Sequence, residues 1–578
     1  MSIASRVIIG LFFSAAATTA IHAQSQSIRA ESYLRSFHDL NRFNGAAIIV
    51  DEGRILFEGG FGFADIENQL AVDATSRFPI ASLTRQFTAA LILKLNEEGL
   101  LDLYAPIHSI INEYPLPNGE RITTHHLLTH TSGLPMVPNI PDSTGTLSPA
   151  DILALTWNEA LQFKPGTQST YSNSESVLLE WIVERVTGMS YGDALSLFVL
   201  DPVGLGDTGY EHGLTSTNTR VKGYTRQLTE YKSVQDSYSI LPYVDGILFS
   251  TVRDLGRWAS VISEWGEAPS PFLERKTLEQ MLTLSPGPYG YGFHIRHQSI
   301  GREENVELIE HTGGIPGFSS FLRVFPKHRR LIVLLDNTAS ALSPIMEGLT
   351  SLLWGAEAEP PKPSIAQRIL PIVESAGVAP AIERYRNWRQ TRPTEYDYSP
   401  KELMLLAEHF QNEDPTVAIK ILEAQAEETP EIPLTRFALA ELYAKQGDTV
   451  RAISHVEAAL TFSPGTPNLL TKIQELGGEP DPALTFPTIP VEMTGLKRLA
   501  GEYRIDPVTL LTVELDDGSL LAHRSNESGF QLLPQSATTF LLRGSKVQFI
   551  FDLVDGQAAS VSILEGGRRV SFSRLPSH

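Results

Sequence analysis

The hydrophobic pattern of this 578-residue chain changes twice along its length, and these changes limit how it can fold. Residues 28–356 mix strand-like runs such as "RLIVLLDN" with helical runs such as "SVLLEWIVERVTG". The proline-rich stretch 357–364, "EAEPPKPS", is predicted to be a linker. Residues 365–480 have a helical pattern, and residues 495–578 alternate polar and apolar side chains between glycine-bearing turns. The sequence therefore predicts several domains, as a prior of roughly 150 residues per domain also suggests.

Composition and charge exclude several classes of function. The chain is 42% hydrophobic and 20% charged, which is typical of a globular protein. Its formal charge of -21 argues against nucleic acid as a partner, because phosphate binding needs clustered Lys and Arg. The absence of cysteine excludes disulfides, thiolate metal ligands and a cysteine nucleophile.

The N-terminus has the pattern of a secretory signal peptide. Arg6 precedes an apolar stretch that ends near Ala17, and small residues follow up to Ala23. We expect residues 1–23 to be removed, which takes the formal charge from -21 to -22 because Arg6 is lost. No other stretch has the roughly 18 apolar residues of a membrane helix, so we expect a soluble periplasmic or secreted protein with no membrane span.

The first and last regions predict different fold classes. In residues 28–356 strands bracket a helical middle, which favours an α+β fold with a helical lobe on a mainly antiparallel sheet. Residues 495–578 contain short strands with Asp-Gly turns and predict a small β-barrel or sandwich. Nothing in this last region suggests catalysis.

The helical region contains an internal repeat. Ala418 and Ala452 lie 34 residues apart, and the same offset relates Ile419 to Ile453 and Pro430 to Pro464. This period and pattern resemble the tetratricopeptide repeat, which implies a possible protein partner. The alternative is a plain pair of helical hairpins with coincidental spacing.

The stretch "IASLTRQFTAA", residues 80–90, carries a candidate nucleophile. Ser82 and Arg85 are three positions apart at the start of an apolar helix, so both side chains can face one site. A serine in this position is more often a helix N-cap, and other motifs are needed to favour catalysis.

Those motifs follow in order along the first region. They are "LLTHTSGLP" at 127–135, Tyr171 and Asn173 in "STYSNSE", and His311, Thr312, Gly313 and Gly314 in "EHTGGIPG". This arrangement resembles the serine β-lactamase and penicillin-binding family, in its branch of class C β-lactamases, D-alanyl-D-alanine carboxypeptidases and family VIII esterases.

The resemblance implies a role for each matching residue. Ser82 corresponds to the nucleophile that forms an acyl-enzyme, and Tyr171 to the phenol that exchanges its proton. Asn173 is expected to hydrogen-bond the substrate or residue 85. The N-H groups of Ser82 and Gly314 correspond to the oxyanion hole. His311, followed by Thr312 and Gly313, stands where many relatives have lysine and is expected to offer a hydrogen bond or a pH-dependent charge to a substrate carboxylate.

Arg85 departs from the family pattern, which has lysine there. An arginine stays protonated and cannot be the base. It can stabilise Tyr171 as a phenolate, because a nearby positive charge favours the ionised form of a phenol.

Two hypotheses follow from this departure. The protein is a serine hydrolase working through Ser82 and Tyr171 on an ester, peptide, D-amino-acid peptide or β-lactam, or it is a catalytically impaired relative that binds peptides or cell-wall fragments. The sequence does not discriminate among these substrates. No cofactor motif is present, and for His125, His126 and His130 packing or polar-network roles are favoured over metal binding.

Overall fold

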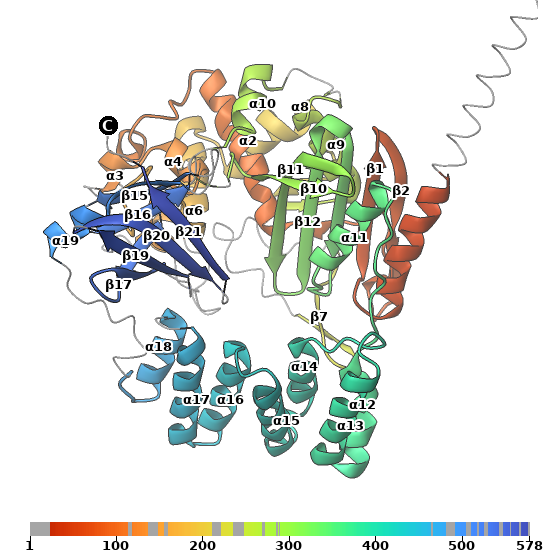
Figure 1. Cartoon of the computed structure of the whole chain (residues 1–578). Helices are drawn as coiled ribbons and strands as arrows, with labels where there is room; N and C mark the ends of the chain where they lie inside the picture. The colour runs from red at the N-terminus through yellow and green to blue at the C-terminus, as the bar shows by residue number, and fades with distance from the viewer. Residues whose placement is uncertain are drawn as a thin grey trace, which may run out of the picture. The chain divides into compact units, whose positions relative to one another are not determined.

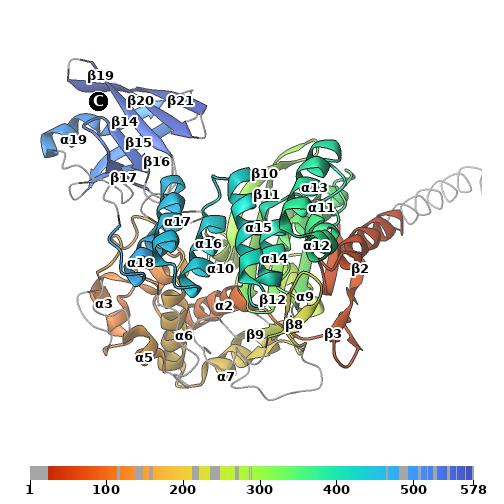
Figure 2. The same ribbon diagram turned by 90° about the horizontal axis from the view of Figure 1, so that it is seen from below.

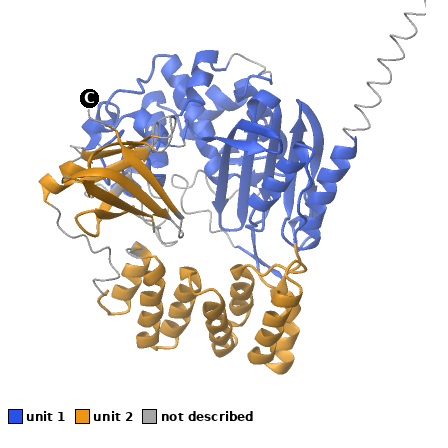
Figure 3. Cartoon of the chain, in the orientation of Figure 1, with its two compact units in different colours: residues 1–226, 230–361 blue, residues 227–229, 362–578 orange. Residues whose placement is uncertain are grey.

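The computed structural model divides into two compact units (Figure 3). Unit 1 comprises Met1–Arg226 and Glu230–Pro361, and unit 2 comprises Gln227–Thr229 and Lys362–His578. The predicted signal peptide, residues 1–23, lies outside the described residues. The structure describes residues 24–575 apart from 114–117, 137–147, 155–159, 211–220, 235–247, 267, 269–271, 285–286, 288, 464–465, 481–491, 505–509, 517–518, 525–529, 543–546, 555 and 566–567.

Unit 1 is built on a six-stranded antiparallel sheet with the order β10-β11-β12-β13-β1-β2 (Figure 1). Strands β1 and β13 lie inside this sheet, and their apolar side chains are buried on both faces. The strands are β1 (Gly45–Asp51), β2 (Arg54–Phe61), β10 (His294–Ile300), β11 (Glu303–Ile315), β12 (Phe318–Phe325) and β13 (Arg330–Asp336).

Helices cover both faces of the sheet, as the alternation along β1 requires. Ile49 packs in a core with the helix at residues 24–39 and with α11 (Ser343–Leu353). Its neighbour Ile48 points to the other face, into a larger core that contains α2 and α9. The sequence prediction of an α+β fold with a helical lobe on an antiparallel sheet is thus confirmed.

The helical lobe and three small sheets complete unit 1. The helices, including the one-turn η elements and the π-helical η4, are η1 (Ala81–Leu83), α2 (Thr84–Glu97), η2 (Ile107–Ser109), α3 (Asn118–Arg121), α4 (Thr124–Leu128), α5 (Pro149–Ala154), α6 (Asn173–Thr187), α7 (Tyr191–Leu195), η4 (Ser196–Leu200), α8 (Asp201–Val203), α9 (Val252–Ile262), α10 (Arg275–Met281) and η5 (Pro326–His328). The short strands are β3 (Phe63–Asp65), β4 (Leu70–Ala71), β5 (Phe78–Pro79), β6 (Gly209–Tyr210), β7 (Tyr224–Arg226), β8 (Tyr231–Ser233) and β9 (Leu248–Ser250).

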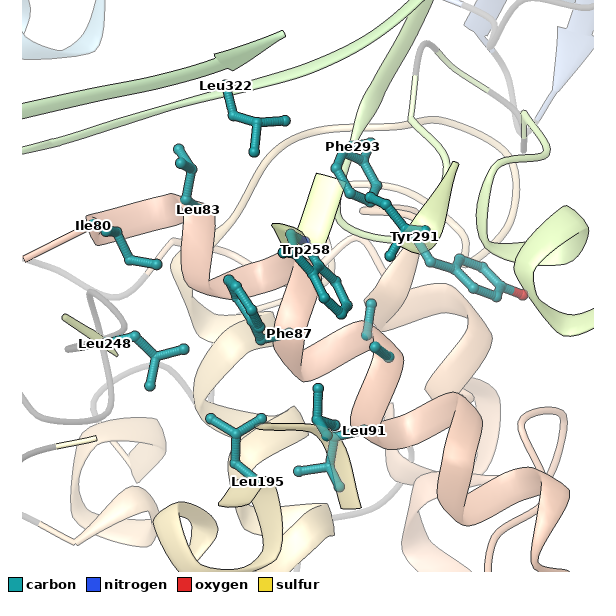
Figure 4. Close-up of a cluster of buried hydrophobic side chains, with 14 of the residues drawn as sticks. Ile80, Leu83, Phe87, Leu91, Leu195, Leu248, Trp258, Tyr291, Phe293 and Leu322 are labelled. Carbon is teal, nitrogen blue, oxygen red and sulfur yellow. The ribbon is translucent and has the colours of Figure 1, made fainter. Parts of the chain in front are cut away.

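Helix α2 runs through the centre of the larger core. Its sequence is apolar around most of its circumference, as expected of a helix enclosed by neighbours. Phe87 stacks on Trp258 of α9, with ring centroids 4.5 Å apart, and the Trp258 indole N-H donates to Gln86 Oε1 at 2.9 Å. Figure 4 shows these rings among Leu91, Leu195 and Phe293. The packing fixes the helix that carries Arg85.

Unit 2 contains a helical segment and a closed barrel. Successive helices of the segment pack against one another, as both ribbon views show (Figure 1, Figure 2). The helices are α12 (Ile365–Ala376), α13 (Val378–Thr391), α14 (Pro400–Phe410), α15 (Pro415–Glu428), α16 (Pro433–Lys445), α17 (Thr449–Phe462) and α18 (Pro467–Glu475). The barrel strands are β14 (Gly501–Arg504), β15 (Leu510–Asp516), β16 (Ser519–Arg524), β17 (Phe530–Pro534), β18 (Thr539–Leu542), β19 (Gln548–Val554), β20 (Gln557–Glu565) and β21 (Arg568–Arg574).

The barrel decides between the two all-β folds predicted for the last region. Each strand pairs with the next, and β14 pairs with β21 to close the sheet. Aromatic side chains, including Tyr503, Phe540 and Phe572, fill its core. The region also begins with a helix, α19 (Met493–Leu499), which the sequence analysis placed in the all-β domain. Leu496 and Leu499 bury this helix in the barrel core, so tertiary packing stabilises it.

A search of the described helices finds none that is both long and apolar enough to span a membrane.

Replacing Phe87 by alanine tests the packing of α2. Because Phe87 is fully buried and stacked on Trp258, we expect Phe87→Ala to lower the free energy of unfolding by about 3–5 kcal/mol. Denaturant unfolding followed by tryptophan fluorescence would measure the loss. Leu197→Ala, at a side chain that is 52% exposed, is the control and should change stability by less than about 0.5 kcal/mol. Equal effects of the two substitutions would contradict this packing.

Candidate active site

Ser82 lies in the one-turn helix η1, directly before α2. Ala81, which precedes it, has a φ of 48°, a left-handed conformation that is uncommon for a residue with a Cβ. Ser320 of β12 holds this turn by donating from its hydroxyl to the Ile80 carbonyl at 2.8 Å. The strained turn thus places Ser82 against the sheet, and such strain often marks a functional site.

Arg85 lies one turn after Ser82 and is only 8% exposed. Its Nη2 donates to Asn173 Oδ1 at 2.5 Å, and its guanidinium carbon lies 4.4 Å from the centroid of the Tyr171 ring. Within the described part of the chain its Nε has no hydrogen-bond partner. The structure therefore brings Arg85, Asn173 and Tyr171 together, as the sequence analysis expected of one site.

Tyr171 ends a loop that leads into α6, and Asn173 is the first residue of that helix. Ser172 caps the helix by accepting from the Ser174 N-H. The Tyr171 hydroxyl donates to Ser82 Oγ at 2.9 Å. A proton can therefore pass between these two oxygens without any movement of the backbone.

His311, Thr312, Gly313 and Gly314 lie within β11, near its end. A Cβ at Gly313 would lie 2.5 Å from the Ile80 carbonyl oxygen and 3.1 Å from the Ser82 nitrogen, so only glycine permits this approach. A Cβ at Gly314 would meet nothing within 4 Å. The strand thus packs against the Ser82 turn at Gly313 and is open at Gly314.

His311 was expected to offer a hydrogen bond or a pH-dependent charge, and its surroundings disfavour the charge. It is 3% exposed, and burial together with the Arg85 charge lowers its pKa to about 3. Its Nδ1 lies 2.6 Å from the Thr312 carbonyl oxygen, so Nδ1 carries the single proton of the neutral ring. His311 therefore offers no positive charge to a substrate carboxylate near neutral pH.

The sequence analysis did not place Glu175 or Ser132 in the site. Glu175, in the first turn of α6, contacts His130 Nδ1 through Oε2 and accepts from the Ser132 hydroxyl at 2.5 Å through Oε1. The ring of His130 lies 4.7 Å from that of Tyr171. His130 thus has the polar-network role predicted for it. The motifs "LLTHTSGLP" and "YSNSE" contained these residues, but their spacing gave no sign that they pair.

Several other ionisable side chains surround these residues. Tyr289 lies 6.2 Å from both Tyr171 and His311, and its pKa is raised mainly by burial. Burial also lowers the pKa of His294, which packs on Tyr289. Burial, together with the Glu184 charge, raises the pKa of Glu180 on α6 well above its usual value, although the Arg85 charge opposes this shift. In the described ranges, no three His, Asp or Glu side chains form a group that could hold a metal ion.

Comparison with known proteins identifies the family. A family model described as beta-lactamase matches residues 30–345, more than half of the chain. The chain belongs to the beta-lactamase family. Apart from Gln227–Thr229, the match lies within unit 1, and it contains all the site residues described above.

Relatives of this beta-lactamase-family protein include penicillin-binding protein 4* of Bacillus subtilis, 28% identical over 345 residues, which are 54% of this chain and 72% of that protein. Protein flp of Staphylococcus aureus is 26% identical over 318 residues, 53% of this chain and 62% of that protein. The chain thus spans less than two thirds of protein flp. Among solved structures, the hydrolase EstCE1 is similar in fold, with a TM-score of 0.51 and 19% identity over 58% of this chain and 100% of that one.

The neutral state of His311 predicts a pH dependence of stability for the beta-lactamase-family domain. The unfolded histidine binds a proton below a pKa of about 6.5, whereas folded His311 stays neutral down to about pH 3. The free energy of unfolding should therefore decrease as pH falls from about 6.5 to about 3, by at most about 1.4 kcal/mol per pH unit. His311→Gln should lack this contribution. Denaturant unfolding at several pH values would measure it, and parallel curves for the two proteins would contradict it.

Proposed function

We propose that the protein is a periplasmic or secreted serine hydrolase that is acylated at Ser82 by an ester or amide. The hydrogen bond between Tyr171 and Ser82 carries the proposal. Ser82 Oγ attacks the substrate carbonyl carbon while its proton passes to the Tyr171 oxygen, and Tyr171 then gives the proton to the leaving group. Water releases the acyl group in a second step. The localisation rests on the signal-peptide pattern of residues 1–23.

Arg85 supports Tyr171 in this mechanism and does not act as a base. Its charge lies against the Tyr171 ring, where it favours the phenolate form that accepts the Ser82 proton. Asn173 fixes the guanidinium by accepting a hydrogen bond from Arg85 Nη2. The backbone N-H groups of Ser82 and Gly314 are the proposed oxyanion hole, and the close contact at Gly313 supports this role because it holds the strand against the Ser82 turn.

The state of His311 favours substrates without a carboxylate next to the scissile bond. A neutral ring whose Nδ1 donates to a backbone carbonyl leaves Nε2 as a hydrogen-bond acceptor. An acceptor attracts neutral donors and repels a carboxylate. We therefore propose an ester or an internal amide as the substrate, in preference to a β-lactam or a peptide with a free C-terminal carboxylate.

The alternative function is binding without turnover. The guanidinium of arginine is planar and larger than the ammonium of lysine, and here it donates a hydrogen bond to Asn173. If Arg85 keeps Tyr171 from accepting the proton, the site binds peptides or cell-wall fragments and releases them unchanged.

Labelling of Ser82 decides between the two functions. We expect intact mass to show one fluorophosphonate adduct on the native protein and none on Ser82→Ala, with slower labelling by a fluorescent penicillin because of its carboxylate. Tyr171→Phe should slow labelling by about 10²–10⁴-fold, because it removes the proton acceptor. Ser109→Ala, at an exposed serine, is the control. Labelling of Arg85→Lys alone would instead support the binding function.

We further propose that the helical segment is of the tetratricopeptide type and binds a protein partner. Helices α15 and α17 have the same length and begin 34 residues apart, and Ala418 and Ala452 are fully buried at equivalent positions. A cavity of about 280 Å³ opens between α14 and α16. Its lining includes Met404, Ala407, Phe437 and Leu442 with Glu408 and Lys445, a mixture of apolar and charged groups suited to a peptide segment.

Matched substitutions test the repeat. Ala418→Leu and Ala452→Leu should each destabilise the helical segment by about 1–3 kcal/mol, because both place a larger side chain in the same packed contact. Lys420→Leu, on an exposed face of α15, should have little effect. Thermal unfolding followed by circular dichroism would compare them. A large cost at one alanine and none at the other would favour a plain pair of hairpins.

A further inference from the structure

The pair formed by Glu175 and His130 is buried beside the proposed catalytic tyrosine. Glu175 is 1% exposed and His130 is 4% exposed. Both carboxylate oxygens of Glu175 are engaged, one by His130 Nδ1 and the other by the Ser132 hydroxyl. The position of Glu175 in the first turn of α6 also favours its negative charge, because the helix N-terminus is positive. These contacts hold the buried carboxyl group of Glu175 in place.

His130 also contacts the tyrosine loop through its backbone and its ring. The Thr170 N-H donates to the His130 carbonyl at 2.8 Å, directly before Tyr171 in the chain. The His130 ring lies 4.7 Å from the Tyr171 ring and 4.8 Å from the Tyr289 ring. His130 has a φ of 56°, an uncommon conformation that the surrounding contacts must maintain. One residue therefore sets both the path of the loop and the packing of its tyrosine.

The other charged and titratable groups around Tyr171 have fixed states near neutral pH. Arg85 of α2 is always positive. Burial keeps Tyr289 protonated by raising its pKa, and it keeps His294 of β10 and His311 of β11 neutral by lowering theirs. Burial likewise raises the pKa of Glu180, deeper on α6. In the described part of the chain, Glu175 and His130 form the remaining carboxylate–imidazole pair beside Tyr171.

We propose that the buried Glu175–His130 pair is a positioning element for Tyr171, which holds the phenol ring against Ser82 and places a second cationic side chain beside it. The inference rests on the proposed function of Ser82 and Tyr171. A carboxylate in contact with an imidazole favours the protonated ring. In the proposed arrangement the His130 charge offsets that of Glu175, so that Arg85 can favour the phenolate that accepts the Ser82 proton. Without His130, the Glu175 carboxylate would oppose the effect of Arg85 on Tyr171.

A small cavity connects the pair to Arg85. Its volume is about 20 Å³, enough for one water molecule, and Arg85, His130 and Glu175 all line it. Arg85, which lines this cavity, has a buried Nε with no hydrogen-bond partner among the described residues. A water there would join the two cations to the one carboxylate and satisfy the buried donor.

The pH profile of acylation tests the pair. His130→Gln and His130→Phe both remove the cation, the first keeping a donor for Glu175 and the second keeping a ring against Tyr171. For whichever variant folds, we expect fluorophosphonate labelling at pH 7 to be about tenfold slower. The rate should recover at higher pH, so that the pH profile of labelling moves up by about one pH unit. The double substitution His130→Gln with Glu175→Gln removes both charges and should return the profile to its native position.

A matched control separates charge from packing. Ser132→Ala removes a hydrogen bond from Glu175 without changing any charge, so the position of its profile should match that of the native protein. A purely structural role for His130 would slow labelling by the same factor at every pH, and the double variant would be no better than His130→Gln. Either result would overturn the proposal.

A second measurement does not depend on activity. The ultraviolet absorbance of tyrosinate, taken as the difference between a protein and its Tyr171→Phe counterpart, reports the ionisation of Tyr171 alone. His130→Gln should move this titration to higher pH, and an unchanged titration would overturn the inference. If the native protein is never labelled, the proposed hydrolase function fails, but this titration still decides whether Glu175 and His130 act on Tyr171.

Discussion

The permanent positive charge of Arg85 is the constraint on which the rest of the site depends. A buried charge is strongly destabilising unless polar groups surround it. Here the Asn173 carbonyl oxygen and the face of the Tyr171 ring meet the guanidinium. These partners come from α6 and the loop before it, whereas Arg85 comes from α2, so the charge couples two elements that are distant in sequence. The tightly packed core around Phe87 and Trp258 gives that coupling a rigid base.

The same charge also contributes to the pKa shifts of other buried groups, although burial is the main cause of those shifts. It helps to keep His311 neutral, and it opposes the burial that keeps Glu180 protonated. The site therefore holds one cation that never titrates, near side chains such as Tyr289, His294 and His311 in which burial disfavours the charged form. Such an environment suits a reaction in which negative charge develops briefly on the Tyr171 or carbonyl oxygen and is stabilised by groups already in place.

Much of this arrangement could be predicted from the sequence because it depends on local order. Ser82 and Arg85 are three positions apart at the start of one helix, and Tyr171 and Asn173 lie where α6 begins, so each pair is recognisable from local spacing. The resemblance to a known family implied that the two pairs share one site. Glu175 and His130 are 45 residues apart, and only the folded chain shows that they meet. The protonation of His311 was equally hidden, because it depends on burial and on a neighbouring charge. Helix α19 was missed because it is stabilised by the packing of Leu496 and Leu499 in the barrel core, which the local sequence does not show.

The closed barrel of unit 2 has a consequence for how the protein resists aggregation. With β14 paired to β21, the barrel offers no free strand edge to another molecule. The six-stranded sheet of unit 1 does have edges, at β2 and β10. Strand β10 carries His294, Arg296 and His297, and such charged or polar side chains discourage pairing between molecules. Strand pairing between molecules should therefore involve the edges of the unit 1 sheet and leave the closed barrel out.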